Sequence, residues 1–276
     1  MNEQQSFATD SLPNGLERFS IASDAGSLEV FRQGAHVTAW TPAGHRPVLF
    51  MSSRSQFAPG KAIRGGVPVI FPWFGNRSDG QPGPAHGFAR TALWTLDSPQ
   101  PSFSLVAESL EATFQATLLP AALELRLTVH NAGESTRRFE NALHTYFAVS
   151  DVREVTVSGL ENTAFLDKTD GFARKQSGGE PLRLTGETDS VYLDTTTTCT
   201  ITDPAWQRRI VIAKSGSNTT VVWNPWAQKC AAMADMGPED WTGMLCVESA
   251  NAAENAILLA AGESHTMTVR FTVESV

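Results

Sequence analysis

The sequence is poor in the residues that cross-link a protein or anchor it in a membrane. Its three cysteines, Cys199, Cys230 and Cys246, are far apart and form no C-x-x-C pair, which argues against a disulfide framework and a cysteine zinc site. No stretch approaches the roughly 18 consecutive apolar residues that a spanning helix needs, and the polar start of the chain is unlike a secretory signal. These absences predict a soluble protein of the reducing cytoplasm.

Positive charge and cofactor motifs are also scarce. The chain has 21 lysines and arginines against 29 acidic residues, a formal net charge of −8, so it has no general attraction for nucleic acid or an anionic membrane. An anionic ligand would have to be bound by a few well-placed arginines. The sequence has no G-x-S-x-G, Walker A or G-x-G-x-x-G motif, and its six histidines form no H-x-H or H-x-x-x-H pair. Hydrolase, NTPase and dinucleotide chemistry are therefore disfavoured, and no metal or other cofactor is expected.

What the sequence does have is alternation of apolar and polar residues, interrupted by glycine, proline and asparagine turns. With 276 residues and 41% apolar content, this pattern predicts one all-β domain, 1–276, built as a large antiparallel β-sandwich. Few short helices are expected, the best candidate being residues 228–236, and residues 1–15 are expected to be a poorly ordered or peripheral segment. The apolar alternation occurs at Leu28 and Val30, at Leu123, Leu125, Leu127 and Val129, at Val155 and Val157, at Leu182 and Leu184, at Val191 and Leu193, and at Met267, Val269, Phe271 and Val273.

Two mostly apolar segments each contain a lone ionisable residue. His144 lies in NALHTYFA (141–148) and Glu248 in GMLCVESAN (243–251). Read as one strand, 139–149 places His144 on its more polar face, where it is either a structural histidine or a catalytic one. Glutamate is seldom buried without a partner, so at Glu248 either the strand reaches the surface or the carboxylate has a function. An imidazole and a carboxylate tuned by burial suit general acid–base catalysis near neutral pH.

Two arginines lie beside glycines and aromatic residues. Arg64 precedes Gly65 and Gly66, which would let a ligand approach the backbone, and Arg90 closes HGFAR (86–90). A planar guanidinium can bind a phosphate through two parallel hydrogen bonds. The alternatives are a salt-bridged loop arginine for Arg64 and a solvated strand end for Arg90.

Taken together, these segments resemble the D-hexose-6-phosphate mutarotases, or glucose-6-phosphate 1-epimerases, of the aldose 1-epimerase superfamily. The resemblance covers nearly the whole chain and implies the galactose mutarotase-like supersandwich, with the sugar in a concave groove. Its most specific motifs are IRGGVP (63–68), FPWFG (71–75), HGFAR (86–90), LHTYF (143–147), DKT (167–169), VWNPW (222–226) and CVE (246–248).

The resemblance implies an isomerase that interconverts the α and β anomers of an aldohexose 6-phosphate without a cofactor. Glu248 would be the catalytic base, taking the proton from the anomeric hydroxyl. His144 would be the catalytic acid, donating a proton to the ring oxygen. The ring opens to the aldehyde, rotation about C1–C2 exposes the other carbonyl face, and closure reverses both proton transfers.

The same resemblance implies a set of substrate-binding residues. Arg64 and Arg90 would bind the phosphate, Asp189 a sugar hydroxyl, and His86 would line the groove. Family members often carry glutamine just before the His-Gly pair, where this chain has Ala85. This departure removes one polar contact and leaves the preferred hexose phosphate open, with glucose 6-phosphate as the default.

Two other functions fit parts of the pattern. A non-catalytic sugar-phosphate binding module would use the arginines and aromatic residues but would not need an acid and a base on separate strands. An epimerase of unphosphorylated aldoses would not need the arginine pair. The expected partner is a small sugar phosphate, and the protein is expected to be a monomer.

Overall fold

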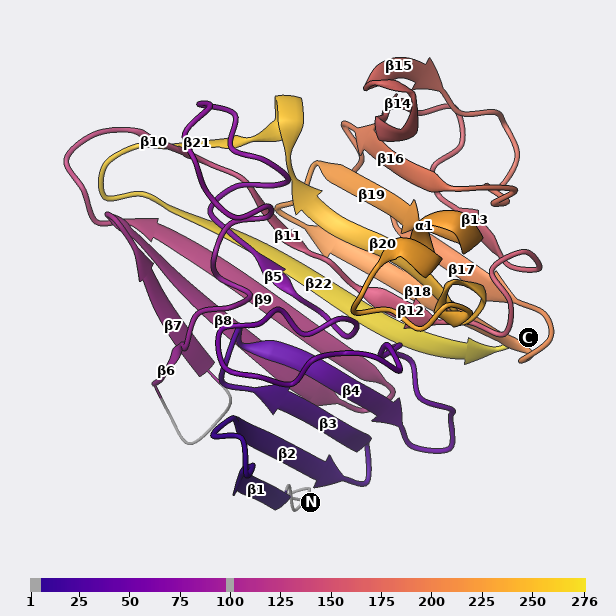
Figure 1. Ribbon diagram of the computed structural model, residues 1–276, viewed down its shortest axis with the longest axis horizontal. Helices are drawn as coiled ribbons and strands as arrows, with labels where there is room; N and C mark the ends of the chain where they lie inside the picture. The colour runs from indigo at the N-terminus through magenta and orange to yellow at the C-terminus, as the bar shows by residue number, and fades with distance from the viewer. Residues whose placement is uncertain (1–5, 98–101) are drawn as a thin grey trace.

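The computed structural model describes residues 6–97 and 102–276, and two eight-stranded antiparallel sheets dominate it (Figure 1). The first sheet has the order β15-β14-β16-β19-β20-β11-β5, with β12 also pairing with β20. Its central strand, β20, is buried along its whole length. The strands of this sheet are β5 (Val69–Ile70), β11 (Asn141–Leu143), β12 (Tyr146–Ala148), β14 (Ala164–Asp167), β15 (Ala173–Gln176), β16 (Thr188–Leu193), β19 (Thr219–Asn224) and β20 (Met244–Asn251).

The second sheet has the order β13-β17-β18-β22-β9-β8-β7-β6. Its long strands alternate as the sequence predicts, since the leucines of β9 are buried while the residues between them are more exposed. Its strands are β6 (Thr95–Leu96), β7 (Ser102–Ala107), β8 (Leu110–Leu119), β9 (Ala122–Asn131), β13 (Thr156–Ser158), β17 (Cys199–Asp203), β18 (Arg208–Ser215) and β22 (Ser264–Ser275).

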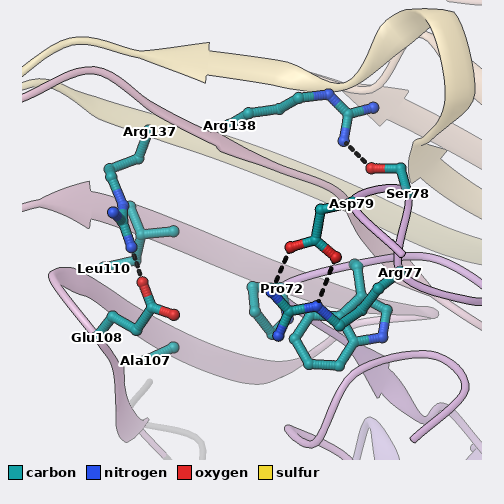
Figure 2. Close-up of a pocket in the computed structure, with 10 residues that line it drawn as sticks. Pro72, Arg77, Ser78, Asp79, Ala107, Glu108, Leu110, Arg137 and Arg138 are labelled. Carbon is teal, nitrogen blue, oxygen red and sulfur yellow. Dashed lines mark hydrogen bonds and ion pairs between the residues drawn. The ribbon is translucent and has the colours of Figure 1, made fainter. Parts of the chain in front are cut away.

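Two smaller sheets complete the sandwich. A meander of β1 (Ser6–Ser11), β2 (Glu17–Ser23), β3 (Gly26–Phe31) and β4 (His36–Pro42) lies at the N-terminal end, with β1 at its edge. Residues 1–5 of the segment expected to be peripheral lie outside the described part. A two-stranded ribbon joins β10 (Arg137–Phe139) to β21 (Ile257–Leu259). Figure 2 shows a cavity of about 430 Å³ between β10, the β7–β8 turn and residues 72–79.

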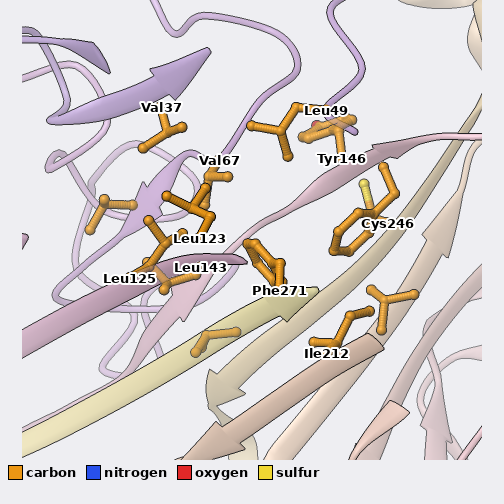
Figure 3. Packing of buried hydrophobic residues seen from close by; sticks show 14 of the residues in the cluster. Val37, Leu49, Val67, Leu123, Leu125, Leu143, Tyr146, Ile212, Cys246 and Phe271 are labelled. Carbon is orange, nitrogen blue, oxygen red and sulfur yellow. The ribbon is translucent and has the colours of Figure 1, made fainter. Parts of the chain in front are cut away.

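Aromatic side chains join the sheets into one core. Phe147 of β12 meets Phe271 of β22 edge-on at 5.2 Å between ring centroids, which links the two large sheets. Trp40 of β4 packs against the same Phe271 at 6.3 Å, and Phe19 of β2 meets Phe103 of β7 at 5.5 Å. Figure 3 shows Phe271 among other buried residues of the core, which include Leu123, Leu125 and Leu143. The predicted all-β sandwich is therefore confirmed.

Helices are few and short, as predicted, but the expected helix at 228–236 is placed wrongly. The observed helix α1 spans Trp226–Ala232, after which the chain turns so that Met236 enters the core and Asp235 meets Arg64. The other helical segments are the single turns η1 (Lys168–Asp170), η2 (Asp240–Gly243) and η3 (Ala253–Asn255). No helix in the described residues is long and apolar enough to cross a membrane.

The strand expected at Leu182 and Leu184 is also wrong. Leu182 makes only an isolated bridge to Val157. Pro181, directly before it, has no N–H to continue a ladder.

Candidate active site

His144 lies at a break in a strand, where the sequence predicted one continuous strand over 139–149. The segment is divided into β10, β11 and β12, and the last gap falls at His144 and Thr145. The Thr145 N–H and hydroxyl both turn back to the carbonyl of Leu143, at 2.9 and 3.2 Å. The His144 N–H donates to the carbonyl of Pro68 at 3.0 Å. The break leaves the imidazole on the wall of a cavity of about 280 Å³ instead of in a regular cross-strand row.

Glu248 lies in the middle of the buried strand β20, with 1% of its side chain exposed. The alternative that its strand reaches the surface is therefore excluded. Register places Glu248 opposite Val221 of β19, and its side chain lines the same cavity as His144.

The imidazole and the carboxylate face each other, with 3.4 Å between His144 Nε2 and Glu248 Oε1. Their other polar atoms, His144 Nδ1 and Glu248 Oε2, are buried and have no hydrogen-bond partner among the described residues. A buried polar group without a partner costs free energy. Each member of the pair thus retains a polar atom to offer a ligand.

Burial dominates the proton affinity of both groups. It raises the pKa of Glu248 well above its ordinary value, an effect that Asp189 reinforces and Lys168 opposes. It lowers the pKa of His144 well below its ordinary value, and nearby His86, Arg64 and Arg90 lower it further. The arginines therefore act on the histidine, whereas the Lys168–Asp189 pair acts on the glutamate.

Arg64 is ion-paired, as its alternative interpretation supposed, and it also reaches the site. Its Nε and Nη2 donate to one carboxylate oxygen of Asp235, at 3.0 and 2.8 Å. Its Nη1 donates to the hydroxyl of Tyr146 at 2.9 Å. The two following glycines serve the backbone, because a Cβ at Gly65 or Gly66 would lie 2.5 or 2.2 Å from a neighbouring carbonyl oxygen. Both have positive φ, so close chain packing, and not ligand approach, explains them.

Arg90 lines the same cavity, so it is not a solvated strand end. It is half-buried, and its Nη2 donates to the carbonyl of Ala85 at 2.9 Å. Burial lowers its pKa, although a guanidinium stays charged at any pH of interest. Within the described residues no carboxylate forms an ion pair with it. Its guanidinium is therefore available to bind an anionic ligand.

Asp189 extends from β16 into the cavity and forms an ion pair with Lys168 at 2.9 Å. Lys168 comes from the turn of the β14–β15 hairpin, and its ammonium also lies 5.5 Å from the ring centroid of Phe74. A second lysine of the cavity, Lys229 on α1, is ion-paired with Glu187 at 2.7 Å.

His86 forms the wall next to His144, with 5.7 Å between their ring centroids. Its Nδ1 accepts a hydrogen bond from the Gly75 N–H, at 3.2 Å, and burial with nearby Arg90, Lys168 and Arg64 lowers its pKa to about 3. His86 is therefore neutral near pH 7 and can hydrogen-bond a sugar without adding charge.

The structure brings all six predicted site residues to this one cavity: Arg64, His86, Arg90, His144, Asp189 and Glu248. The sequence interpretation assigned no role to several others. Lys168 was visible only as part of the DKT motif, and Lys229 and Asp235 gave no signal. Trp223 and Phe74 were visible only within the VWNPW and FPWFG motifs. Tyr146 stacks on His144 at 4.9 Å between centroids and supports it from behind.

The larger cavity differs in its charges (Figure 2). Its arginines are all ion-paired: Arg77 with Asp79, Arg137 with Glu108, and Arg138 with Glu140.

Similarity to known proteins agrees with this geometry. Residues 17–272 match the family described as aldose 1-epimerase. The chain belongs to the aldose 1-epimerase family. A protein of Cenchrus ciliaris, provisionally named a glucose-6-phosphate 1-epimerase, is 35% identical over 277 residues, covering 91% of this chain and 83% of its own. An Escherichia coli (strain K12) protein with the same provisional name is 37% identical over 237 residues, covering 80% of this chain and 79% of its own.

Two solved structures share the fold. A provisionally named mutarotase (YeaD) from Salmonella typhimurium superposes with a TM-score of 0.87 at 27% identity, over 99% of this chain and 96% of that one. A galactose mutarotase-like protein from Clostridium acetobutylicum, at 13% identity, has a TM-score of 0.72 over 98% and 99% of the two chains. Membership of this family makes the protein an isomerase that interconverts sugar anomers.

Proposed function

We propose that this enzyme interconverts the α and β anomers of an aldohexose 6-phosphate, with glucose 6-phosphate as the default substrate. The single observation that carries the proposal is Arg90, a cation without an ion-pair partner among the described residues, in the cavity that also holds the facing pair His144 and Glu248. The pair supplies proton transfer, and Arg90 supplies a site for the phosphate. The provisional names of the relatives point to the same substrate.

Glu248 is proposed as the base. In its ionised form it removes the proton of the anomeric O1 hydroxyl, while the electron pair of O1 forms the carbonyl and the C1–O5 bond breaks. His144, as the imidazolium, donates its proton to O5. After rotation about C1–C2, O5 attacks the other carbonyl face and returns its proton to His144, while protonated Glu248 gives its proton back to O1, so both groups are regenerated with no net proton exchange with solvent. Proton transfer of this kind contributes about 10²–10⁴-fold to a rate.

The cavity has two charged groups of residues, Arg64 with Arg90 and Lys168 with Asp189, and the chemistry of the substrate fits both. O5 is bonded to C5, which carries C6 and the phosphate ester, so the donor to O5 must lie near the phosphate. Arg64 and Arg90 are the charges that act on His144. O1 lies at the opposite side of C1 from C5, and Asp189 and Lys168 are the charges that act on Glu248. We therefore place the phosphate at Arg64 and Arg90 and the sugar hydroxyls near Asp189 and His86.

Retention of the acid–base pair weighs against a pure binding module. Free aldoses are less suited, because the half-buried Arg90, which has no ion-pair partner among the described residues, would face a neutral sugar. A monomeric state, a cytoplasmic location and the absence of a nucleic-acid partner stay predictions.

Exchange spectroscopy by NMR tests the proposal. The purified enzyme should increase the α–β exchange rate of glucose 6-phosphate well above the spontaneous rate, and should act less on glucose. Equal acceleration of both sugars would remove the phosphate from the proposal, and no acceleration of either would remove catalysis.

A further inference from the structure

Tyr146 links Arg64 to the imidazole of His144. Arg64 Nη1 donates to the hydroxyl of Tyr146 at 2.9 Å, and the Tyr146 ring stacks on His144 at 4.9 Å with 12° between planes. Arg90 lines the same 280 Å³. A cation held this close to an imidazole in a poorly solvated cavity disfavours a second positive charge on the ring.

The other charges around His144 are already balanced in pairs. Arg64 pairs with Asp235, Lys168 with Asp189, and Lys229 with Glu187. Among the described residues Arg90 has no such partner, and the only one of Glu248 is His144 itself, at 3.4 Å between Nε2 and Oε1. The titratable and charged groups that surround His144 are Glu248 and Cys246 on β20, Tyr146 on β12, Asp189 on β16, His86 and Arg90 after β5, Arg64 before β5, Lys168 on η1 and Lys229 on α1, with Asp235 behind Arg64.

The charges in the free enzyme thus oppose protonation of His144, its proposed acid. His144 must carry a proton to open the ring, yet burial and both arginines lower its pKa. The proposed substrate brings the missing charge with it, because its phosphate is separated from O5 only by C5, C6 and the ester oxygen.

We propose that the phosphate dianion of the substrate activates His144: by neutralising Arg90 and further screening Arg64, which Asp235 already pairs, the dianion lets the imidazole hold the proton that it donates to O5. This inference rests on the proposed function and goes beyond it. The phosphate becomes part of the catalytic apparatus as well as the part of the substrate that is bound. Selection for phosphorylated sugars then occurs in kcat as well as in KM.

The first test measures His144 directly and needs no turnover. Histidine labelled with ¹³C at Cε1 is titrated by NMR with and without inorganic phosphate, and the His144 signal is assigned with His144→Asn. Saturating phosphate should raise the pKa of His144 by about one pH unit, since an opposite charge within ~4–6 Å has an effect of that size. In Arg90→Gln the pKa should start higher and respond less to phosphate. An unchanged pKa in the wild type overturns the proposal, whether phosphate binds without effect or does not bind.

The second test separates the phosphate from the sugar. Exchange of free glucose is measured with added phosphite dianion, which can occupy the phosphate position beside an unphosphorylated sugar. The wild type should gain about tenfold in kcat/KM, in step with the protonated fraction of His144, and the gain should saturate. Phosphite that only inhibits, or has no effect, contradicts activation.

The third test uses charge at position 90. Arg90→Gln should exchange free glucose about three- to tenfold faster than the wild type near pH 7, because the cation that opposes the imidazolium is gone. Arg90→Lys keeps the charge and should not gain. A merely structural role for Arg90 would lower the glucose rate in both variants. Arg137→Gln, which changes an arginine of the larger cavity, is the matched control and should behave as wild type.

These tests distinguish the two proposals. If the wild type does not accelerate exchange of glucose 6-phosphate, the proposed function fails, and the titration of His144 still decides whether an anion at Arg90 controls the imidazole. If exchange is fast but the titration and phosphite have no effect, only the activation fails.

Discussion

The two cavities described above, around Arg138 and around His144, differ more in their charges than in their size. The larger, of about 430 Å³, is lined by three arginines, and each is ion-paired to an acidic side chain. The smaller, of about 280 Å³, holds Arg90, which pairs with no carboxylate in the part of the chain that the structure describes. It also holds the buried side chains of His144 and Glu248, each of which keeps one polar atom without a partner there. Volume alone would select the cavity whose arginines are all ion-paired. Buried ionisable groups without partners are a better guide to a reacting site, because a fold bears their cost only where function requires them.

The largest effect is expected from the acid–base pair. His144→Asn and Glu248→Gln should each lower kcat for glucose 6-phosphate by about 10²–10⁴-fold, the usual contribution of a positioned acid or base. Substrate affinity should change little, since the phosphate contacts remain. Exchange rates of each purified variant, measured by NMR, and binding, measured by calorimetry, check both statements. Rates near wild type in either variant would refute the assigned roles.

The arginines should come next, and unequally. Arg90→Ala should lower kcat/KM for glucose 6-phosphate by about a hundredfold and Arg64→Ala by about tenfold, because hydrogen bonds to charged groups contribute about 1.5–3 kcal/mol each and Arg64 is already engaged by Asp235. Steady-state kinetics on the two variants compares them. A larger loss at Arg64 would shift the phosphate site toward Asp235.

Lys168 should tune the base. Its charge opposes the raised pKa of Glu248, so Lys168→Met should raise that pKa further. A base with a higher pKa is protonated up to a higher pH, and the acidic limb of the pH–rate profile should therefore move upward, with about tenfold less activity near pH 6. A loss that is uniform across pH would indicate a structural role for the Lys168–Asp189 pair.

The buried carboxylate should reduce stability, and removing it should help the fold. The pKa of Glu248 is raised in the folded state. The unfolded chain therefore loses this proton at lower pH than the folded chain does, and stability falls as pH rises from the unfolded value toward the folded one. Glu248→Gln has no such proton, so its melting temperature should exceed that of the wild type by a margin that widens from pH 5 to pH 8. A constant margin would mean that Glu248 is ionised in the free fold.

The smallest effect is expected in the larger cavity. Its ion pair between Arg137 and Glu108 is partly exposed, so Arg137→Gln should change the free energy of unfolding by less than about 1 kcal/mol and leave activity within about twofold. Urea unfolding and exchange kinetics measure the two. A large loss of activity would show that the larger cavity also serves the reaction.

Much of the fold could be predicted from the sequence, because alternation in segments such as β9 and β22 reports directly on which face is buried. His144 and Glu248 could be found in the same way, as lone ionisable residues in apolar runs. The break at His144 could not, since it depends on Thr145 turning back to Leu143 and on a bond to Pro68.

The electrostatic balance of the site was equally hidden. The partner of Arg64 is Asp235, far along the chain, and the pairing of Lys168 with Asp189 joins a hairpin turn to another strand. Such contacts follow from tertiary packing, and no local pattern encodes them. These contacts determine that Arg64 has a carboxylate partner while Arg90 has none among the described residues, which the residue types alone do not reveal.

The chain has only two tyrosines, Tyr146 and Tyr192. Both are buried, and Tyr146 lies between the guanidinium of Arg64 and the ring of His144. Biosynthetic replacement by 3-fluorotyrosine would therefore give a ¹⁹F spectrum of two lines. One line comes from Tyr146, beside His144, and the other comes from Tyr192, beside Phe165, and serves as an internal reference. The protein thus carries a built-in spectroscopic reporter that could follow ligand arrival, protonation and release in unmodified buffer or inside living cells.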